Sequence, residues 1–157
     1  MIEVNNLTTS QVDEEFLKKV AEIVLGGEKK KNAELSIALI GQGRIRELNK
    51  RYKGKNRVTD VLAFPDKEIG LGEVVICLRE VKKNAKKFSS TFEKELAQVL
   101  IHGILHLLGY GHEKPSTRAK LGAGLVPHRN RVSGAGSDTQ AKKTEGKQNY
   151  YLKLFFK

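Results

Sequence analysis

The chain has 157 residues, of which 39% are apolar and 30% charged, and it carries 29 Lys and Arg against 18 Asp and Glu. This length and composition predict one globular domain, at most with a tail, and exclude a wholly disordered chain. No apolar run approaches the roughly 18 residues that a bilayer span needs, and the N-terminus lacks signal-peptide features. We therefore expect a cytoplasmic protein. The single cysteine, Cys77, excludes an intramolecular disulfide and a cysteine-rich zinc site.

The net charge of +11 is concentrated near the C-terminus. Residues 1–114 carry 20 basic and 16 acidic side chains, whereas residues 115–157 carry 9 basic and 2 acidic ones. We expect residues 1–114 to form the folded domain. Residues 115–147, rich in Gly, Ser, Ala, Lys and Arg, are typical of a flexible basic insertion. Residues 148–157 (QNYYLKLFFK) are apolar and aromatic, which predicts a terminal helix or strand that docks on the domain.

Hydrophobic periodicity predicts an alternation of strands and helices along the domain. The expected elements are a strand at 2–7, a helix at 13–25, a strand at 34–40, a helix through Ile45, Leu48 and Tyr52, strands at 61–65 and 71–78, a helix at 79–87 and a helix from about 92 to 108. Thr9 or Ser10 could cap the first helix, and Gly26 and Gly27 could end it. This order predicts an α+β fold, a mixed sheet with packed helices.

The helix predicted at 92–108 is apolar nearly all round, so it should be buried. His102 and His106 are four residues apart on it, which places both imidazoles on one face, as a pair of metal ligands requires. Gly109 allows a turn after the helix, and His112 could supply a third nitrogen. Three imidazoles leave a coordination position open for water, as in catalytic zinc sites. We expect one Zn²⁺ per chain, although nickel or copper would also suit three histidines.

Two simpler interpretations compete with this site. A lone histidine on an apolar helix is usually a hydrogen-bonded core residue, but a second one turn away is hard to explain without a cation between them. His128, alone in the polar tail, is expected to be a solvated bystander. The spacing H-x3-H-x2-G-x2-H is that of metzincin proteases, whose general-base Glu follows the first His. Gly103 takes that position here, so peptidase chemistry would need a carboxylate from elsewhere.

A basic segment precedes the strand at 61–65, and its cations are Lys50, Arg51, Lys53, Lys55 and Arg57. A charge run of this kind is often only a solvated surface. Next to a hydrolytic metal it would instead hold phosphate, which favours RNA or DNA as the substrate. Thr59 and Asp60 are expected to shape the loop, and Glu73 could support a ligand histidine.

Four segments together resemble the YbeY family of bacterial endoribonucleases: HGILHLLGYGH at 102–112, TDVLAFP at 59–65, LNKRYKGKNR at 48–57 and LGEVVI at 71–76. The resemblance covers residues 1–114. It implies a metal-dependent endoribonuclease specific for single strands, acting in 16S rRNA 3′-end maturation and ribosome quality control. It also implies that His102, His106 and His112 bind zinc on a buried helix and the following turn.

The resemblance further implies ribosomal RNA and the small ribosomal subunit, or its assembly proteins, as partners, with no membrane involved. Arg51, Lys53, Lys55 and Arg57 would bind RNA, and Lys53, at a position where the family usually has Arg, would be the catalytic cation. Lysine keeps the charge but loses the bidentate fork.

Two other departures from the family pattern are Gly111, where the family usually has Asp, and residues 116–146, which match nothing in it. The nucleophile, water or the ribose 2′-hydroxyl, stays open. An alternative function is a non-catalytic RNA-binding ribosome assembly factor in which the metal only holds the fold.

Overall fold

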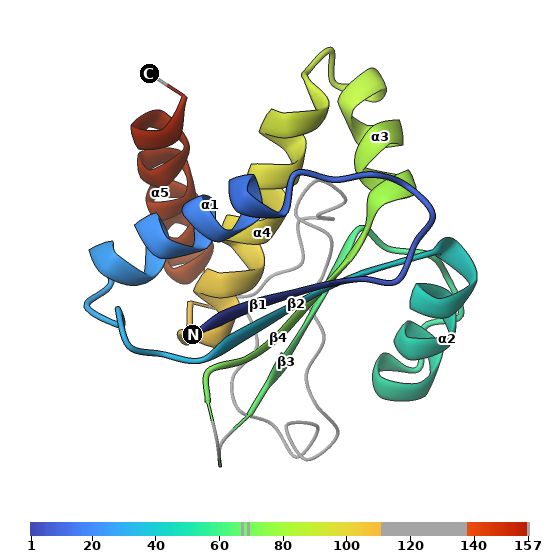
Figure 1. Cartoon of the computed structure of the whole chain (residues 1–157), viewed down its shortest axis with the longest axis horizontal. Coiled ribbons are helices and arrows are strands. Elements are labelled where there is room, and N and C mark those ends of the chain that lie inside the picture. The colour runs from blue at the N-terminus through green and yellow to red at the C-terminus, as the bar shows by residue number, and fades with distance from the viewer. Residues whose placement is uncertain (67, 69, 111–137, 157) are drawn as a thin grey trace.

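The computed structural model describes residues 1–66, 68, 70–110 and 138–156. Their helices and strands are, in chain order, β1 (Ile2–Asn6), α1 (Glu14–Gly27), β2 (Leu35–Ile40), α2 (Gln42–Lys53), β3 (Val61–Pro65), β4 (Gly72–Cys77), α3 (Leu78–Lys87), α4 (Phe92–Leu107) and α5 (Asp138–Phe155) (Figure 1). This order and the α+β class confirm the expectation from the sequence. In the described part of the chain, no helix is both long enough and apolar enough to cross a bilayer.

The four strands form one mixed sheet in the order β1-β2-β4-β3. Strands β1, β2 and β4 are parallel, and β3 pairs with β4 in the antiparallel direction. Val74 of β4 lies opposite Ile37 on one side and Ala63 on the other. Within the described residues β3 is therefore an edge strand, which leaves one of its sides open to the surroundings.

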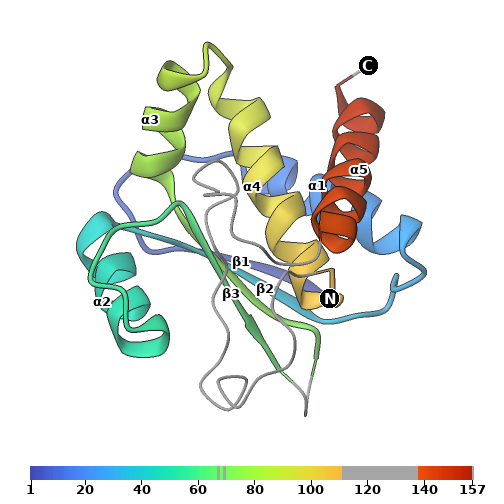
Figure 2. The same ribbon diagram turned by 180° about the vertical axis from the view of Figure 1, so that it is seen from behind.

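The helices cover the two faces of the sheet unequally. Helices α1, α4 and α5 pack together on one face, with α3 beside α4, whereas α2 covers the other face (Figures 1 and 2). The alternation of side chains along β4 follows this division. Val74 and Ile76 belong to the larger core, under α1 and α4, and Val75 and Cys77 belong to the smaller core, under α2.

Helix α1 begins and ends differently from the expectation. Its N-cap is Asp13, whose carboxylate accepts a hydrogen bond of 3.0 Å from the backbone N–H of Phe16, so neither of the two expected hydroxyl residues caps it. The helix also continues through Gly26 to Gly27. A Cβ at Gly27 would collide with the phenol of Tyr151, so glycine is needed there because α5 approaches closely.

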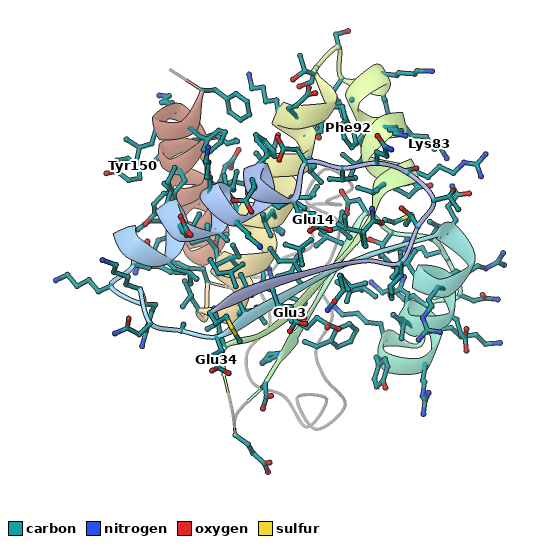
Figure 3. The ribbon with its side chains drawn as sticks, in the orientation of Figure 1. Glu3, Glu14, Glu34, Lys83, Phe92 and Tyr150 are labelled. Carbon is teal, nitrogen blue, oxygen red and sulfur yellow. The ribbon has the colours of Figure 1, made fainter. Side chains whose placement is uncertain are left out.

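Helix α5 begins at Asp138, ten residues before the apolar cluster at 148–157. Residues 138–147, which the sequence suggested were flexible, therefore form the first half of this helix, and the rest of the expected insertion lies outside the described residues. Tyr151 and Leu152 of α5 are buried in the larger core, and Tyr150 points away from the domain (Figure 3). The aromatic C-terminus thus returns to the domain as a helix.

Candidate metal centre

Helix α4 bears the candidate site and is buried in the larger core. Its start at Phe92 matches the expected range, and the Thr91 hydroxyl caps it by accepting a hydrogen bond of 3.1 Å from the backbone N–H of Lys94. Glu93 and Glu95 lie in the first turn, where their charge suits the helix dipole. From Glu95 to Leu105 nearly every side chain is buried. The histidines are therefore held on a helix that has little freedom to move.

Gly103 explains how α4 can lie so close to the sheet. A Cβ at this position would stand 2.7 Å from Val74 Cγ1 and 3.5 Å from Val61 Cγ2. Because the first distance is below a normal contact, no larger residue fits without moving the helix or the strand. The position next to the first histidine therefore serves packing, and a general-base glutamate could not occupy it in this fold.

His102 and His106 lie one above the other on α4, as their spacing predicts. Their ring centroids are 5.1 Å apart, and the ring planes are inclined by 49°. The side chain of His102 is buried, with 1% of its surface exposed, and that of His106 is partly exposed. One imidazole is thus fixed inside the core, and its neighbour lies closer to the surface.

Gln148 of α5 is the hydrogen-bond partner of the buried imidazole. His102 Nδ1 and Gln148 Oε1 are 3.0 Å apart, and Gln148 is 4% exposed. No local sequence pattern indicates this contact, because the two residues are 46 positions apart. Glu73 was expected to support a ligand histidine, and this expectation is wrong. The Glu73 carboxylate lies on the face of the sheet opposite α4, where it accepts a 3.0 Å hydrogen bond from Ser36 Oγ.

The chain beyond His106 is tied to both α1 and α5. Gly109 ends the helix with φ of 97°, a conformation that suits glycine. The hydroxyl of the next residue, Tyr110, donates to Glu28 Oε2 at 2.8 Å, and its carbonyl accepts from Thr144 Oγ1 at 3.2 Å. His112 follows two residues later. Both it and the unusual Gly111 lie outside the described residues.

Glu28 is the centre of this connection. Besides Tyr110, it accepts hydrogen bonds from Tyr151 Oη at 2.6 Å and from Lys147 Nζ at 3.0 Å. Burial alone would raise the pKa of Glu28, but hydrogen bonds from these three donors outweigh it and hold the pKa below its ordinary value. Burial and the Glu28 hydrogen bond raise the pKa of Tyr151, and the Glu28 hydrogen bond raises that of Tyr110. Glu28 therefore joins α1, α4 and α5 as a carboxylate.

The donor set at this end of α4 fits a metal ion such as zinc. Two neutral imidazoles one helical turn apart are a common half of a zinc site, and a hydrogen bond to the other ring nitrogen is the usual support for such a ligand. Across the residues that the structure describes, no Asp, Glu, Cys or third His completes a group of three with this pair. The carboxylate that peptidase chemistry would require is likewise not found there.

The basic segment lies on the other side of the sheet from the histidines. Arg51 and Lys53 are at the end of α2, and Lys55 and Arg57 are exposed in the loop that leads into β3. The Arg51 guanidinium lies 5.5 Å from the centroid of the Tyr52 ring. The structure therefore brings the two histidines together and keeps the four RNA-binding candidates together, but α4 and α2 lie on opposite faces (Figures 1 and 2).

Local hydrogen bonds hold this loop, and Asp60 takes part in them as expected. Thr59 is buried as well, but its hydroxyl has no hydrogen-bond partner among the described residues. Asn49 Nδ2 donates to the carbonyl of Arg57 at 3.0 Å, and Asn84 Nδ2 donates to Asp60 Oδ2 at 3.2 Å. The backbone N–H of Cys77 donates to the carbonyl of Asp60 at 2.9 Å. These bonds tie the loop to α2, α3 and β4.

The fold and the histidine pair define an α+β protein with a candidate metal centre on a buried helix. Known proteins resemble this chain in sequence and in fold. A family model described as Endoribonuclease YbeY matches residues 3–124 of this chain. The chain therefore belongs to the YbeY endoribonuclease family. The match ends ten residues beyond the stretch over which the motifs suggested the resemblance.

Individual relatives agree with this assignment. An Endoribonuclease YbeY from Sulfurihydrogenibium sp. (strain YO3AOP1) is 42% identical over 119 residues, which are 72% of this chain and 78% of the relative. One from Thermotoga maritima is 42% identical over 114 residues, 71% of this chain and 73% of the relative. The solution structure of a Thermotoga maritima protein matches with a TM-score of 0.61 and 31% identity, over 98% of this chain and 87% of the other.

Proposed function

We propose that this protein is a metal-dependent endoribonuclease that cleaves single-stranded RNA, with 16S ribosomal RNA near its 3′ end as the substrate. The observation that carries the proposal is the pair of neighbouring imidazoles on α4, one of them buried and hydrogen-bonded, in a chain of the YbeY endoribonuclease family. The expected place of action is the cytoplasm. The expected partners are the small ribosomal subunit or its assembly proteins.

His102 and His106 would hold the metal, with His112 as the third ligand predicted from the sequence. We expect zinc, and the same imidazoles would also accept nickel or copper. A metal bound there lowers the pKa of a coordinated water and neutralises charge on phosphoryl oxygens. His102, being buried, fixes the position of the site, and the partly exposed His106 lies closer to where a substrate could approach.

The route for RNA that best fits the geometry crosses the edge strand β3. The basic loop leads directly into β3 at Val61, and α4 lies against the same strand, so β3 is shared by both groups of residues. A phosphate chain passing over this edge could contact cations on the α2 side and the metal on the α4 side. Arg51, Lys53, Lys55 and Arg57 would bind the backbone, and Lys53 would stabilise charge on the reacting phosphate.

A second candidate function is a non-catalytic RNA-binding assembly factor with a structural metal. The observation in its favour is the burial of His102 and its bond to α5, because a metal on this residue would also hold the C-terminal helix. The two functions differ in what the metal is needed for. An enzyme needs it for cleavage, and an assembly factor needs it for stability.

Replacing His106 by Ala separates the two candidates. Zinc content, the melting temperature and cleavage of a single-stranded RNA are measured on the full chain. For the enzyme we expect loss of zinc and of cleavage, with the fold kept because His106 is only partly buried. For a structural metal we expect a large fall in melting temperature instead. Lys94→Ala, an exposed change on the same helix, is the control. A metal-free protein that still cleaves RNA would contradict the site.

A further inference from the structure

The contact between α4 and α5 behind the histidine pair has a consequence for metal binding. We propose that Gln148 is a positioning residue: its amide oxygen accepts the proton of His102 Nδ1 and so leaves Nε2 of the same ring as the atom that binds metal. The inference rests on the proposed metal centre. It gives the C-terminal helix a part in the function of the site, although this helix lies beyond the family match at residues 3–124.

The orientation of the Gln148 amide follows from its second contact. Gln148 Nε2 lies 3.4 Å from the carbonyl oxygen of Gln98, and a carbonyl can only accept a hydrogen bond. The amide NH₂ must therefore face Gln98, and the amide oxygen faces His102 at 3.0 Å. An oxygen at this distance from a ring nitrogen requires the hydrogen to be on that nitrogen. The neighbouring residues thus select the Nδ1–H form of the imidazole.

This tautomer makes Nε2 the nitrogen of His102 that can bind a metal. A neutral imidazole carries one hydrogen, so a hydrogen on Nδ1 leaves the lone pair on Nε2. Partners of this kind fix both the tautomer and the ring orientation of metal-binding histidines, and their loss typically lowers metal affinity by about 10- to 100-fold. Because His102 is only 1% exposed, water has little access to replace Gln148 in this role.

Two further contacts fix Gln148 in place along α5. Thr144 donates to the carbonyl of Tyr110 at 3.2 Å, and Tyr151 donates to Glu28 at 2.6 Å. Residues 144, 148 and 151 recur at the spacing of one helical face, and all three are buried. One face of α5 therefore contacts the rest of the domain at three positions along the helix, and Gln148 is the middle position. The amide is held toward His102 by the docking of the whole helix.

Nuclear magnetic resonance of the ¹⁵N-labelled full chain, freed of metal by a chelator, tests the proposal. Long-range ¹H–¹⁵N correlations report which nitrogen of His102 carries the hydrogen. We expect the Nδ1–H form in the unsubstituted protein. In Gln148→Met, which keeps the size of the side chain but removes the acceptor, we expect a shift toward the Nε2–H form. Zinc affinity, measured against a competing chelator, should then fall about 10- to 100-fold.

Lys153→Ala is the matched control, because it changes an exposed side chain of α5 and leaves Gln148, Thr144 and Tyr151 intact. It should change neither the tautomer nor the zinc affinity. If Gln148→Met does not fold, Gln148→Asn is used instead. It keeps the amide but shortens the side chain by one methylene, which moves the amide oxygen away from His102. An Nε2–H form in the unsubstituted protein, or an unchanged tautomer and zinc affinity in Gln148→Met, would overturn the proposal. If the unsubstituted chain binds no zinc, the proposal of a metal centre is wrong. The tautomer comparison would still decide whether Gln148 sets the tautomer of His102.

Discussion

The two faces of the sheet place their candidate functional residues in opposite environments. On the α4 face, His102 lies in the core, and α5 supplies a partner for its ring. On the α2 face the core is smaller, and Lys55 and Arg57 are exposed in a loop. A metal site needs ligands held at fixed distances, and a surface that binds a flexible phosphate chain needs accessible charge.

This difference separates two kinds of effect. Changes on the α4 face should alter the free energy of unfolding together with the proposed metal affinity, because α4, which bears His102, packs in the core with α1 and α5. Changes to the exposed cations should alter RNA binding with little effect on folding. Matched substitutions on the two faces therefore test whether one face affects mainly folding and metal affinity and the other mainly RNA binding.

The largest expected difference in stability is between two glycines in helices. Gly103→Ala on α4 would place a Cβ 2.7 Å from Val74, and overpacking of this kind should lower the free energy of unfolding by about 1–3 kcal/mol. Gly43→Ala on α2 has no atom within 4 Å of its Cβ, and alanine should stabilise that helix by about 0.5–1 kcal/mol. Urea denaturation of both variants measures the contrast. Equal effects would mean that α4 does not lie closer to the sheet than α2.

A dependence of stability on pH is expected on the α4 face. The folded pKa of Glu28 is below its ordinary value of 4.5, so its bonds to α5 contribute fully above that pH. They are lost as the pH falls through the folded pKa, because the protonated carboxyl no longer holds Lys147 and both tyrosine hydroxyls in the same way. The difference in unfolding free energy between the unsubstituted protein and Glu28→Gln should therefore shrink below about pH 4.5. A constant difference across this range would contradict the role of Glu28.

Much of the α4 face could be predicted from the sequence, because the signals there are local. Three features of α4 lie within one short stretch of the sequence. They are its apolar pattern, the hydroxyl that caps it and the four-residue spacing of its histidines. Glu73 could also have been placed correctly: Val74 had to face the core under α4, so its neighbour had to face the other way. That alternation is visible in the sequence.

What could not be predicted depends on contacts between distant parts of the chain. Gln148 has no motif, and its role appears only when α5 packs against α4. The first half of α5 has few apolar residues, and docking through one face, at Thr144 and then Gln148, stabilises it more than helix propensity would. Likewise, no local pattern indicates that α2 and the basic loop lie on the face opposite the histidines.

A smaller effect, on binding and not on folding, is expected for the exposed cations. Lys55→Ala should weaken binding of single-stranded RNA similarly for all sequences and reduce the salt dependence of binding by about one unit of slope. Lys83→Ala removes the same charge from α3, where Lys83 is 67% exposed in its side chain and lies 3.5 Å from Glu80. This side chain points outward (Figure 3). Titrations at several salt concentrations compare the two variants. Equal losses would indicate that net charge, and not this loop, attracts RNA.

The smallest expected effect concerns the start of the two helices. The Thr91 hydroxyl caps α4, whereas α2 begins at Gly41 with no side-chain cap. Gly41 has φ of −85° and no atom within 4 Å of a Cβ, so a serine fits there without strain. We expect Gly41→Ser to raise the free energy of unfolding by a few tenths of a kcal/mol, and Thr91→Ala to lower it by about 1 kcal/mol.

Serine is the better choice for this test because Gln42 already donates to Glu80 at 2.8 Å, and an aspartate would add a second negative charge nearby. Thermal unfolding of both variants at equal protein concentration measures the effect. If Gly41→Ser were destabilising, the backbone N–H groups at the start of α2 would have to be satisfied by another partner. The smaller core on this face would then depend on a contact that the new serine disrupts. Helix α2 would be bound to the domain more strongly than the exposure of its surface indicates.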